Sequence, residues 1–251
     1  MKSNLNLLVL AGLMGLLFSG CSGDTSPAAT EDAATSALQG TPLVEAVLTM
    51  AERDALTPGE VLAMLKDGNE RFVSGTLTIR DHSAQVRQAA TGQFPKAMVL
   101  SCVDSRVPVE DVFDRGIGDI FVARVAGNFE NTDILGSMEF ASAAAGAKLI
   151  FVLGHEYCGA VQSAIDGVEL GNITAMLSNI QPAVDHFTEY DSDKTSANED
   201  FVHEVALQNI RQTIEDIRTG SPILAEMEQS GGIKIAGGMY DMHTGRITFI
   251  D

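Results

Sequence analysis

The stretch AMVLSCVDSRVP (97–108) joins an apolar run of strand length to three chemically active side chains. An unbroken apolar run is typical of a strand that is covered on both faces of a sheet. Cys102, Asp104 and Arg106 stand at alternate positions where this run ends. Each of these groups is costly to bury alone, and both a thiol and a carboxylate can bind a metal. The stretch therefore predicts a functional site at the end of a buried strand.

Two further apolar runs indicate the fold class. They are DIFVARVAG (119–127) and KLIFVLG (148–154), and the alanine-rich segment 134–147 between them suits a helix. The order strand, loop, strand, helix, strand predicts an α/β domain with a mostly parallel central β-sheet flanked by helices. The closing segment 231–250 has two β-like runs around the turn at 243–245, which predicts a terminal hairpin added to the sheet.

Helix signals stand before and after these strands. Thr57-Pro58-Gly59-Glu60 supplies a capping residue, a proline at the first helical position and a glutamate three residues after the threonine. Apolar residues then recur at helical spacing as far as Gly75. We expect further helices over 83–90, from Cys158 onward, and over 172–190 and 199–218.

The composition limits the classes of function. The chain has 251 residues, of which 45% are hydrophobic, so it can bury a core without disulfide staples. Its formal net charge is −18 at pH 7. Because such a chain repels a phosphate backbone, we expect no nucleic-acid partner. The acidic residues are better explained as a solvated surface.

The N-terminus has the pattern of an export signal. Lys2 precedes an apolar segment, 5–18, that is short for a membrane span and predicts a signal peptide over residues 1–20. LFSGC places small residues just before Cys21, which resembles a bacterial lipoprotein signal, in which the cysteine is lipidated and becomes the new N-terminus. The alternative is an ordinary secretory signal with an incidental cysteine.

Residues 21–42 are small, polar and without pattern, so we expect a lipidated cysteine followed by a flexible tether. The folded domain is then expected over 43–251. Both interpretations of the signal predict an exported protein. With lipidation it would be a periplasmic or cell-envelope lipoprotein, held to the membrane only through the anchor at Cys21.

A second pair of reactive residues lies at the end of the third apolar run. FVLGHEYCGAV (151–161) places His155 and Cys158 where that strand ends and a helix begins. Ligands often lie at the carboxyl ends of strands in open α/β sheets, so the two strand ends could face one another. Cys102, His155 and Cys158 would then form a Cys₂His zinc site, with the fourth position left for water or Asp104.

Two other interpretations of the cysteines remain open. A disulfide between Cys102 and Cys158 would suit an oxidising compartment, but it explains neither His155 nor Asp104. A cysteine nucleophile with a histidine base is also possible, but it leaves the second cysteine without a role.

The sequence around both strand ends resembles the β-class carbonic anhydrases. The resemblance rests on CVDSRVPVEDVFDRGIGDIFVARVAGN (102–128) followed by VLGHEYCGAV (152–161). It extends to GNERFVSG, GQFPKAMVLSC, SMEFA and IAGGMYDMHTGRITF, and so covers roughly residues 55–250. The two metal-binding segments at this separation are its most specific part.

The resemblance implies a role for each matching position. Cys102, His155 and Cys158 would bind one Zn²⁺ per subunit, and Asp104 would either hold Arg106 or move onto the metal in an inactive state. The implied substrate-binding residues are Gln93, Phe121, Phe140 and Gly159. At position 140 many relatives carry tyrosine, so the phenylalanine departs from the family pattern.

The implied function is the reversible hydration of CO₂ to bicarbonate and a proton by attack of zinc-bound hydroxide. Zinc lowers the pKa of its bound water to about 7 in carbonic anhydrases with three histidine ligands, and that value is adopted here. The resemblance also implies a homodimer or higher homo-oligomer, with residues 43–74 as N-terminal dimerisation helices.

Two rival functions remain. An enzyme with the same fold and metal could hydrolyse CS₂ or COS instead. The width and lining of the pocket entrance decide between these activities, and residue spacing does not show them. A catalytically silent zinc- or bicarbonate-binding lipoprotein is the second rival. Such a protein would be expected to lose Asp104, Arg106 or Gln93, and all three are present.

Overall fold

The computed structural model describes residues 43–250 of the chain. The predicted signal peptide over 1–20 and the predicted tether over 21–42, with Cys21, lie outside the described residues. Residues 43–250 belong to one compact unit that begins near Pro42.

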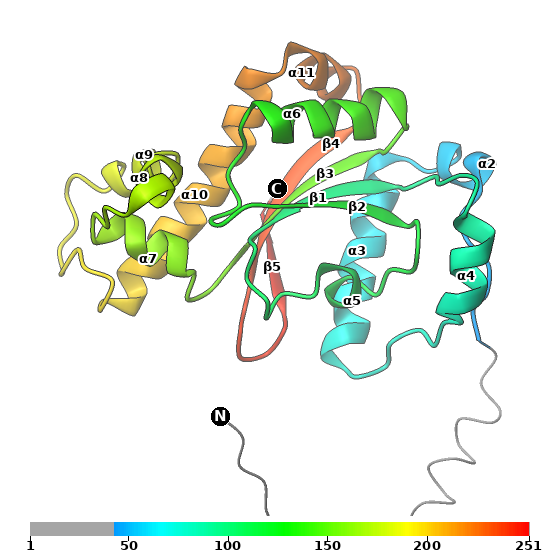
Figure 1. Ribbon diagram of the computed structural model, residues 1–251, viewed down its shortest axis with the longest axis horizontal. Helices are drawn as coiled ribbons and strands as arrows, with labels where there is room; N and C mark the ends of the chain where they lie inside the picture. Colours follow the sequence, from blue (N-terminus) through cyan, green and yellow to red (C-terminus); the bar gives the residue numbers. More distant parts are fainter. Residues whose placement is uncertain (1–42, 251) are drawn as a thin grey trace, which may run out of the picture. The chain divides into compact units, whose positions relative to one another are not determined.

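A five-stranded sheet forms the centre of this unit (Figure 1). Its strand order is β2-β1-β3-β4-β5, and the pairs β1–β2, β1–β3 and β3–β4 are parallel. Only β5 runs antiparallel, as the partner of β4 in the terminal hairpin. This confirms the predicted α/β fold, its mostly parallel sheet and the closing hairpin. The strands are β1 (Ala97–Ser101), β2 (Ile120–Arg124), β3 (Leu149–His155), β4 (Lys234–Tyr240) and β5 (Ile247–Ile250).

Helices cover both faces of the sheet, as its apolar strands require. In Figure 1, α3 (Pro58–Val73) and α5 (Val109–Val112) lie below the sheet, and α6 (Thr132–Glu139) and α11 (Pro222–Gln229) lie above it. Alternate residues of β1 enter the two cores: Val99 packs in the cluster with α3, and Leu100 packs in the cluster with α10 (Glu199–Gly220). The fully buried strands β1 and β3 therefore separate two hydrophobic layers.

Two glycines of the sheet face helix α10. A Cβ built on Gly154 of β3 would lie 2.6 Å from Ile210 Cδ1 of α10. A Cβ on Gly237 of β4 would lie 2.6 Å from Cγ2 of the same isoleucine. Real Cβ atoms do not approach other atoms so closely, so this helix can pack here only because both positions lack side chains.

The N-terminal segment of the described chain, residues 43–81, packs against the sheet through α3. Thr57 caps α3 as predicted, with Glu60 completing the capping box, and Leu65 is buried in the core beside Phe113 and Phe151. The shorter helix α2 (Met50–Asp54) precedes α3, and α4 (His82–Ala89) follows it.

A buried carboxylate fixes this segment further. Asp114 accepts from Arg71 Nε at 2.5 Å, from Arg80 Nη1 at 2.6 Å and from Thr78. These contacts join the N-terminal segment to the loop between α5 and β2.

Two helical predictions need correction, and one helix was missed. The segment predicted as one helix over 134–147 is α6 followed by a π-helical turn, η1 (Phe140–Ala144). The segment predicted over 172–190 is two helices, α8 (Gly171–Leu177) and α9 (Gln181–Asp185), because Asn179 donates to the last carbonyls of α8 and Pro182 starts α9 anew. Helix α11 was not predicted.

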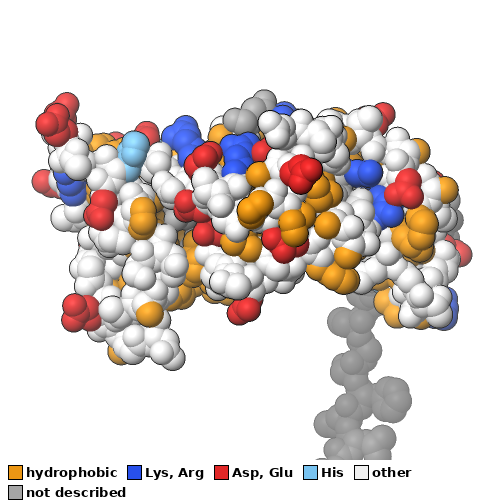
Figure 2. Space-filling model, turned by 90° about the horizontal axis from the view of Figure 1, so that it is seen from above, with side chains coloured by type: hydrophobic (Ala, Val, Ile, Leu, Met, Phe, Trp, Pro, Cys, Tyr) orange, Lys and Arg blue, Asp and Glu red, His pale blue; other side chains and the backbone are white. Residues whose placement is uncertain are grey.

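Figure 2 shows the molecule from above in the orientation of Figure 1, so that the side with α6 and α11 faces the reader. Hydrophobic side chains gather near the middle of this face, among acidic ones. Phe140, just after α6, is 59% exposed. None of the helices within residues 43–250 combines the length and the hydropathy that crossing a membrane requires.

Candidate metal centre

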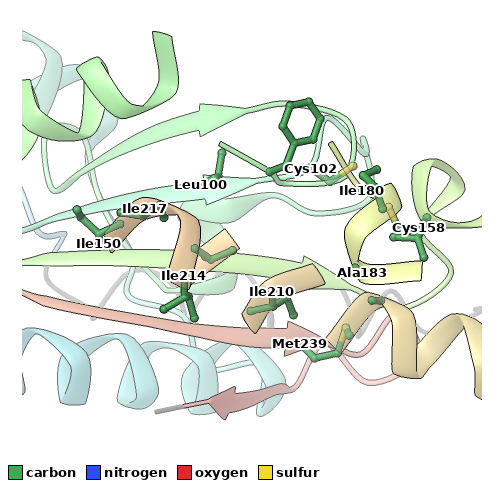
Figure 3. Packing of buried hydrophobic residues seen from close by; sticks show 14 of the residues in the cluster. Leu100, Cys102, Ile150, Cys158, Ile180, Ala183, Ile210, Ile214, Ile217 and Met239 are labelled. Carbon is green, nitrogen blue, oxygen red and sulfur yellow. The ribbon is translucent and has the colours of Figure 1, made fainter. Parts of the chain in front are cut away.

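Two cysteines and a histidine meet at the carboxyl edge of the sheet. Cys102 follows β1, His155 is the last residue of β3, and Cys158 is the N-cap of α7 (Gly159–Ile165). The two thiol sulfurs and an imidazole nitrogen all lie within 4.8 Å of one another, and all three residues are buried. Figure 3 shows the two cysteines at the end of the apolar core, with their sulfur atoms on facing sides. The structure thus brings together the three ligands predicted from separate strand ends.

The donor set fits a metal ion. Both cysteines are free, so the disulfide interpretation is wrong. The Nδ1 atom of His155 lies 2.8 Å from the carbonyl oxygen of Glu156, to which it donates when protonated. That bond leaves the lone pair on Nε2, the arrangement typical of a metal-binding histidine. The Nε2 atom is buried and has no hydrogen-bond partner, an orphaned acceptor that a cation would satisfy.

The Cys102 and Cys158 thiols lie close enough to shift each other's pKa in opposite directions. The hydrogen bond from Cys158 lowers the pKa of Cys102 to about 4, and the same bond raises the pKa of Cys158. Burial lowers the pKa of His155, but the neighbouring Cys102 sulfur and the Glu156 carbonyl outweigh it and raise that pKa overall. A thiolate is therefore already favoured at Cys102, and thiolate is the form that binds zinc.

Asp104 faces Arg106 and lies close to the three ligands. Arg106 donates to both carboxylate oxygens, from Nε to Oδ1 at 2.9 Å and from Nη2 to Oδ2 at 2.7 Å. The Oδ2 atom is also 3.9 Å from His155 Nε2. Arg106 is the main cause that lowers the pKa of Asp104 to about 2, so the carboxylate is ionised at neutral pH.

Arg124 holds the loop that carries Asp104, a role that the sequence did not reveal. Its guanidinium donates to the Cys102 carbonyl at 2.8 Å and to the Val107 carbonyl at 2.7 Å. The two bonds span both ends of the loop that contains Asp104 and Arg106. The only signal for this role in the sequence was the place of Arg124 at the end of an apolar run.

Gly127 supports the first ligand from the other side. Its N–H lies 3.4 Å from Cys102 Sγ, to which it donates, and its φ of +88° favours glycine. Asn209 of α10 donates to the Gly127 carbonyl at 2.8 Å and so fixes this peptide group. Neither residue could be identified from the sequence, since Asn209 is 82 residues away.

Comparison with known proteins identifies the family. Residues 97–247 match the family model described as carbonic anhydrase. The chain belongs to the carbonic anhydrase family. It is 33% identical over 198 residues to carbonic anhydrase 2 of Mycobacterium tuberculosis, covering 74% of this chain and 90% of that protein. It is 34% identical to a carbonic anhydrase of Mycolicibacterium smegmatis, covering 73% of this chain and 88% of that protein.

Solved structures of the β class share the fold. A β-carbonic anhydrase of Aspergillus fumigatus superimposes with a TM-score of 0.61 at 22% identity, covering 77% of this chain and 90% of that one. A tetrameric β-carbonic anhydrase of Sordaria macrospora gives 0.55 at 25% identity, covering 66% of this chain and 89% of that one. The β-class resemblance found in the sequence is therefore confirmed.

The remaining predicted residues of this carbonic anhydrase lie in separate places. Phe121 and Phe140 form an edge-to-face pair with ring centroids 6.2 Å apart, in a surface cavity beside the edge strand β2. Gln93 lines a different surface cavity, next to α4. A Cβ on Gly159 would meet no atom within 4 Å, so packing within the chain does not require glycine there. Their substrate-binding roles stay predictions.

Proposed function

We propose that this carbonic anhydrase hydrates CO₂ reversibly to bicarbonate with one Zn²⁺ per chain, held by Cys102, His155 and Cys158. One observation carries the proposal: three buried ligand atoms lie within 4.8 Å of one another and one of them, His155 Nε2, has no other partner. Two thiolates and an imidazole are a known zinc donor set that leaves a fourth position open. Asp104 stands beside that set as a possible alternative fourth ligand.

The chain's own residues would orient the reaction. When bound, zinc acts as a Lewis acid that makes hydroxide available near neutral pH. The ionised Asp104 can accept the proton of the attacking oxygen in a hydrogen bond at Oδ2, its oxygen nearest the ligands. Arg106 keeps this carboxylate charged and fixed in direction. Arg124 holds both ends of their loop.

Stopped-flow CO₂ hydration by the purified full-length protein tests the proposal, together with its zinc content. We expect about one zinc per chain, and a Cys158→Ala variant that has lost both zinc and activity. Protein without zinc, or equal rates for the two proteins, would overturn it. The same protein assayed with CS₂ and COS tests the rival hydrolase.

We propose further that the protein is exported and anchored through a lipid on Cys21, in the periplasm or cell envelope. The signal-like pattern of residues 1–20 and the small residues before Cys21 support this. Expression in a bacterial host fed an alkyne-tagged fatty acid tests it. We expect a labelled membrane-bound protein, and a Cys21→Ser variant without label. An unlabelled but processed wild type would instead support the ordinary secretory signal.

We also propose a homodimer or higher homo-oligomer. Exposed apolar side chains at the start of the described segment, Leu43, Val44 and Met50, support this. Residues 43–74 would then contribute mainly through 43–54, since α3 is partly committed to its own core. The related Sordaria macrospora structure is tetrameric. Sedimentation analysis tests the proposal, and a monomer at micromolar concentration would contradict it.

A further inference from the structure

The two-residue linker between His155 and Cys158 contains a strained aromatic residue. The chain must pass from His155, the last residue of β3, to Cys158, the N-cap of α7, through Glu156 and Tyr157 alone. Tyr157 does so with a φ of +55°, in the left-handed region that non-glycine residues avoid. Asp114 and Asn128 share this region, but their short side chains tolerate it better than a large ring does. A strained conformation persists only where the surroundings hold it.

The surroundings of Tyr157 come from two distant elements. Its ring packs edge-to-face on His243, in the turn between β4 and β5, with centroids 5.5 Å apart. Its hydroxyl lies 3.1 Å from His243 Nε2 and 3.5 Å from the Glu199 carboxylate at the start of α10. Glu199 is the main cause that raises the pKa of Tyr157, so the phenol remains a protonated donor.

The neighbouring linker residue is held as well. The Glu156 N–H donates to the Tyr240 carbonyl at 3.0 Å, which prolongs the β3–β4 ladder past its end. The Glu156 carboxylate pairs with His203 Nδ1 at 2.7 Å. Both linker residues thus border one cavity of about 250 Å³, lined also by His243, His203 and Glu199. Cys102, His155 and Cys158 are not part of the lining of this cavity.

We propose that Tyr157 is a positioning residue for the metal centre. Its contacts with His243 and Glu199 hold the left-handed turn, and this turn sets the distance and direction between His155 and Cys158. The inference rests on the proposed function in one respect, that these two residues bind a metal. It predicts that groups on the terminal hairpin control metal affinity without touching the metal.

Zinc affinity of the full-length protein, measured by chelator competition, tests this. Tyr157→Phe keeps the ring and loses the hydroxyl contacts, and His243→Leu removes the partner. We expect each variant to raise the zinc dissociation constant about tenfold, the typical effect of a residue that orients a ligand. The double variant should lose less than the product of the two single effects, since both changes remove the contact between the Tyr157 hydroxyl and His243. His186→Leu, which disrupts a histidine–aromatic contact with Phe187 elsewhere, should leave the affinity unchanged.

Tyr157→Gly separates the side chain from the backbone strain. Glycine adopts the left-handed conformation without strain. If that backbone conformation alone set the metal site, with no need for the Tyr157 side chain to hold it, this variant should bind zinc as well as wild type. We expect instead a loss of at least about tenfold, together with altered thiolate-to-metal absorption bands in the cobalt(II) protein. Wild-type affinity and an unchanged cobalt spectrum in Tyr157→Gly would overturn the proposal, as would additive effects in the double variant. If the wild type binds no zinc, the proposed function fails first.

Discussion

Arg106 donates two side-chain hydrogen bonds to the Asp104 carboxylate, from Nε to Oδ1 at 2.9 Å and from Nη2 to Oδ2 at 2.7 Å. The bidentate geometry fixes the carboxylate plane as well as its charge. The question left by the sequence was whether Asp104 faces the arginine or the metal ligands. In this structure it faces the arginine, with one oxygen turned toward His155.

Replacing Asp104 by asparagine should lower the CO₂ hydration rate constant by a factor on the order of 10² or more, because the proton acceptor becomes a weaker one. Arg106→Lys should cost about tenfold, since lysine keeps the charge but not the two-pronged geometry. Stopped-flow kcat values for both variants at matched zinc content provide the check. A larger loss in Arg106→Lys than in Asp104→Asn would be inconsistent with Arg106 acting through Asp104.

The pH profile of the wild type tests the switch. Because Arg106 lowers the pKa of Asp104 to about 2, the carboxylate stays ionised throughout the neutral range. If Asp104 can leave Arg106 for the metal, activity should decline on acidification. The cause would be this movement of Asp104 and not protonation of its carboxylate. A rate that is flat between about pH 6.5 and 9 would rule this switch out.

Arg124→Met should lower kcat by about 10- to 100-fold, the equivalent of the 1.5–3 kcal/mol typical of hydrogen bonds from a charged donor. Loss of the Arg124 guanidinium frees both ends of the loop that carries Asp104, while all three metal ligands remain. We expect zinc content to stay near one per chain. Arg211→Met, on an exposed position of α10, is the matched control and should keep wild-type kcat. An unchanged kcat in Arg124→Met would show that the loop holds its shape alone.

Asp114 should make folding stability depend on pH. Burial would raise the pKa of Asp114, but hydrogen bonds from Arg71, Arg80 and Thr78 outweigh it and hold that pKa at about 2. The unfolded value is about 3.9, so the folded state binds the proton more weakly and the stabilisation is fully present above pH 4. It is lost as the pH falls toward 2.

Urea unfolding of Asp114→Asn measures this contribution. At pH 7 we expect the variant to be less stable by about 1–2 kcal/mol, with the difference shrinking between about pH 4 and 2. Asp67→Asn, an exposed change on α3, should follow the wild type at every pH. A difference that does not change with pH would assign the loss to packing rather than to charge.

Removing the metal should destabilise the fold, because binding ties together the ends of β1 and β3. A chelator should lower the melting temperature by at least about 5 °C, the shift that about 2 kcal/mol produces in a domain of this size. Acid should have the same effect, since protons compete for the thiolates. Calorimetry with and without zinc is the measurement. A Cys102→Ser protein that still responds to zinc in full would place the metal elsewhere.

The sequence predicted the sheet well because its strands are decided locally. The runs at 97–103, 119–127 and 148–154 are apolar without interruption, and burial on both faces follows from that pattern alone. The ligands could be placed for the same reason, since parallel strands carry their carboxyl ends to one edge. The capping box at Thr57 is similarly local.

Features that depend on tertiary contacts were missed. The π-helical turn after α6 and the break before α9 interrupt segments whose composition favours a continuous helix. The support from Arg124, Gly127 and Asn209 depends on backbone carbonyls and amides, which no residue pattern reveals. The conformation of Tyr157 was hidden because only the assembled hairpin and α10 hold it.

The close contact between α10 and Gly154 has a consequence for reading other genomes. The residue after Gly154 is His155, so one added methyl group at position 154 would press directly against Ile210, and either that side chain or the strand that ends in a ligand must shift. Such a chain would still carry both cysteines, the histidine, the aspartate and the arginine. A sequence survey that checks only those five residues would classify it as an active enzyme. Gly154 and Gly237, which take no part in the chemistry, therefore belong in the diagnostic pattern.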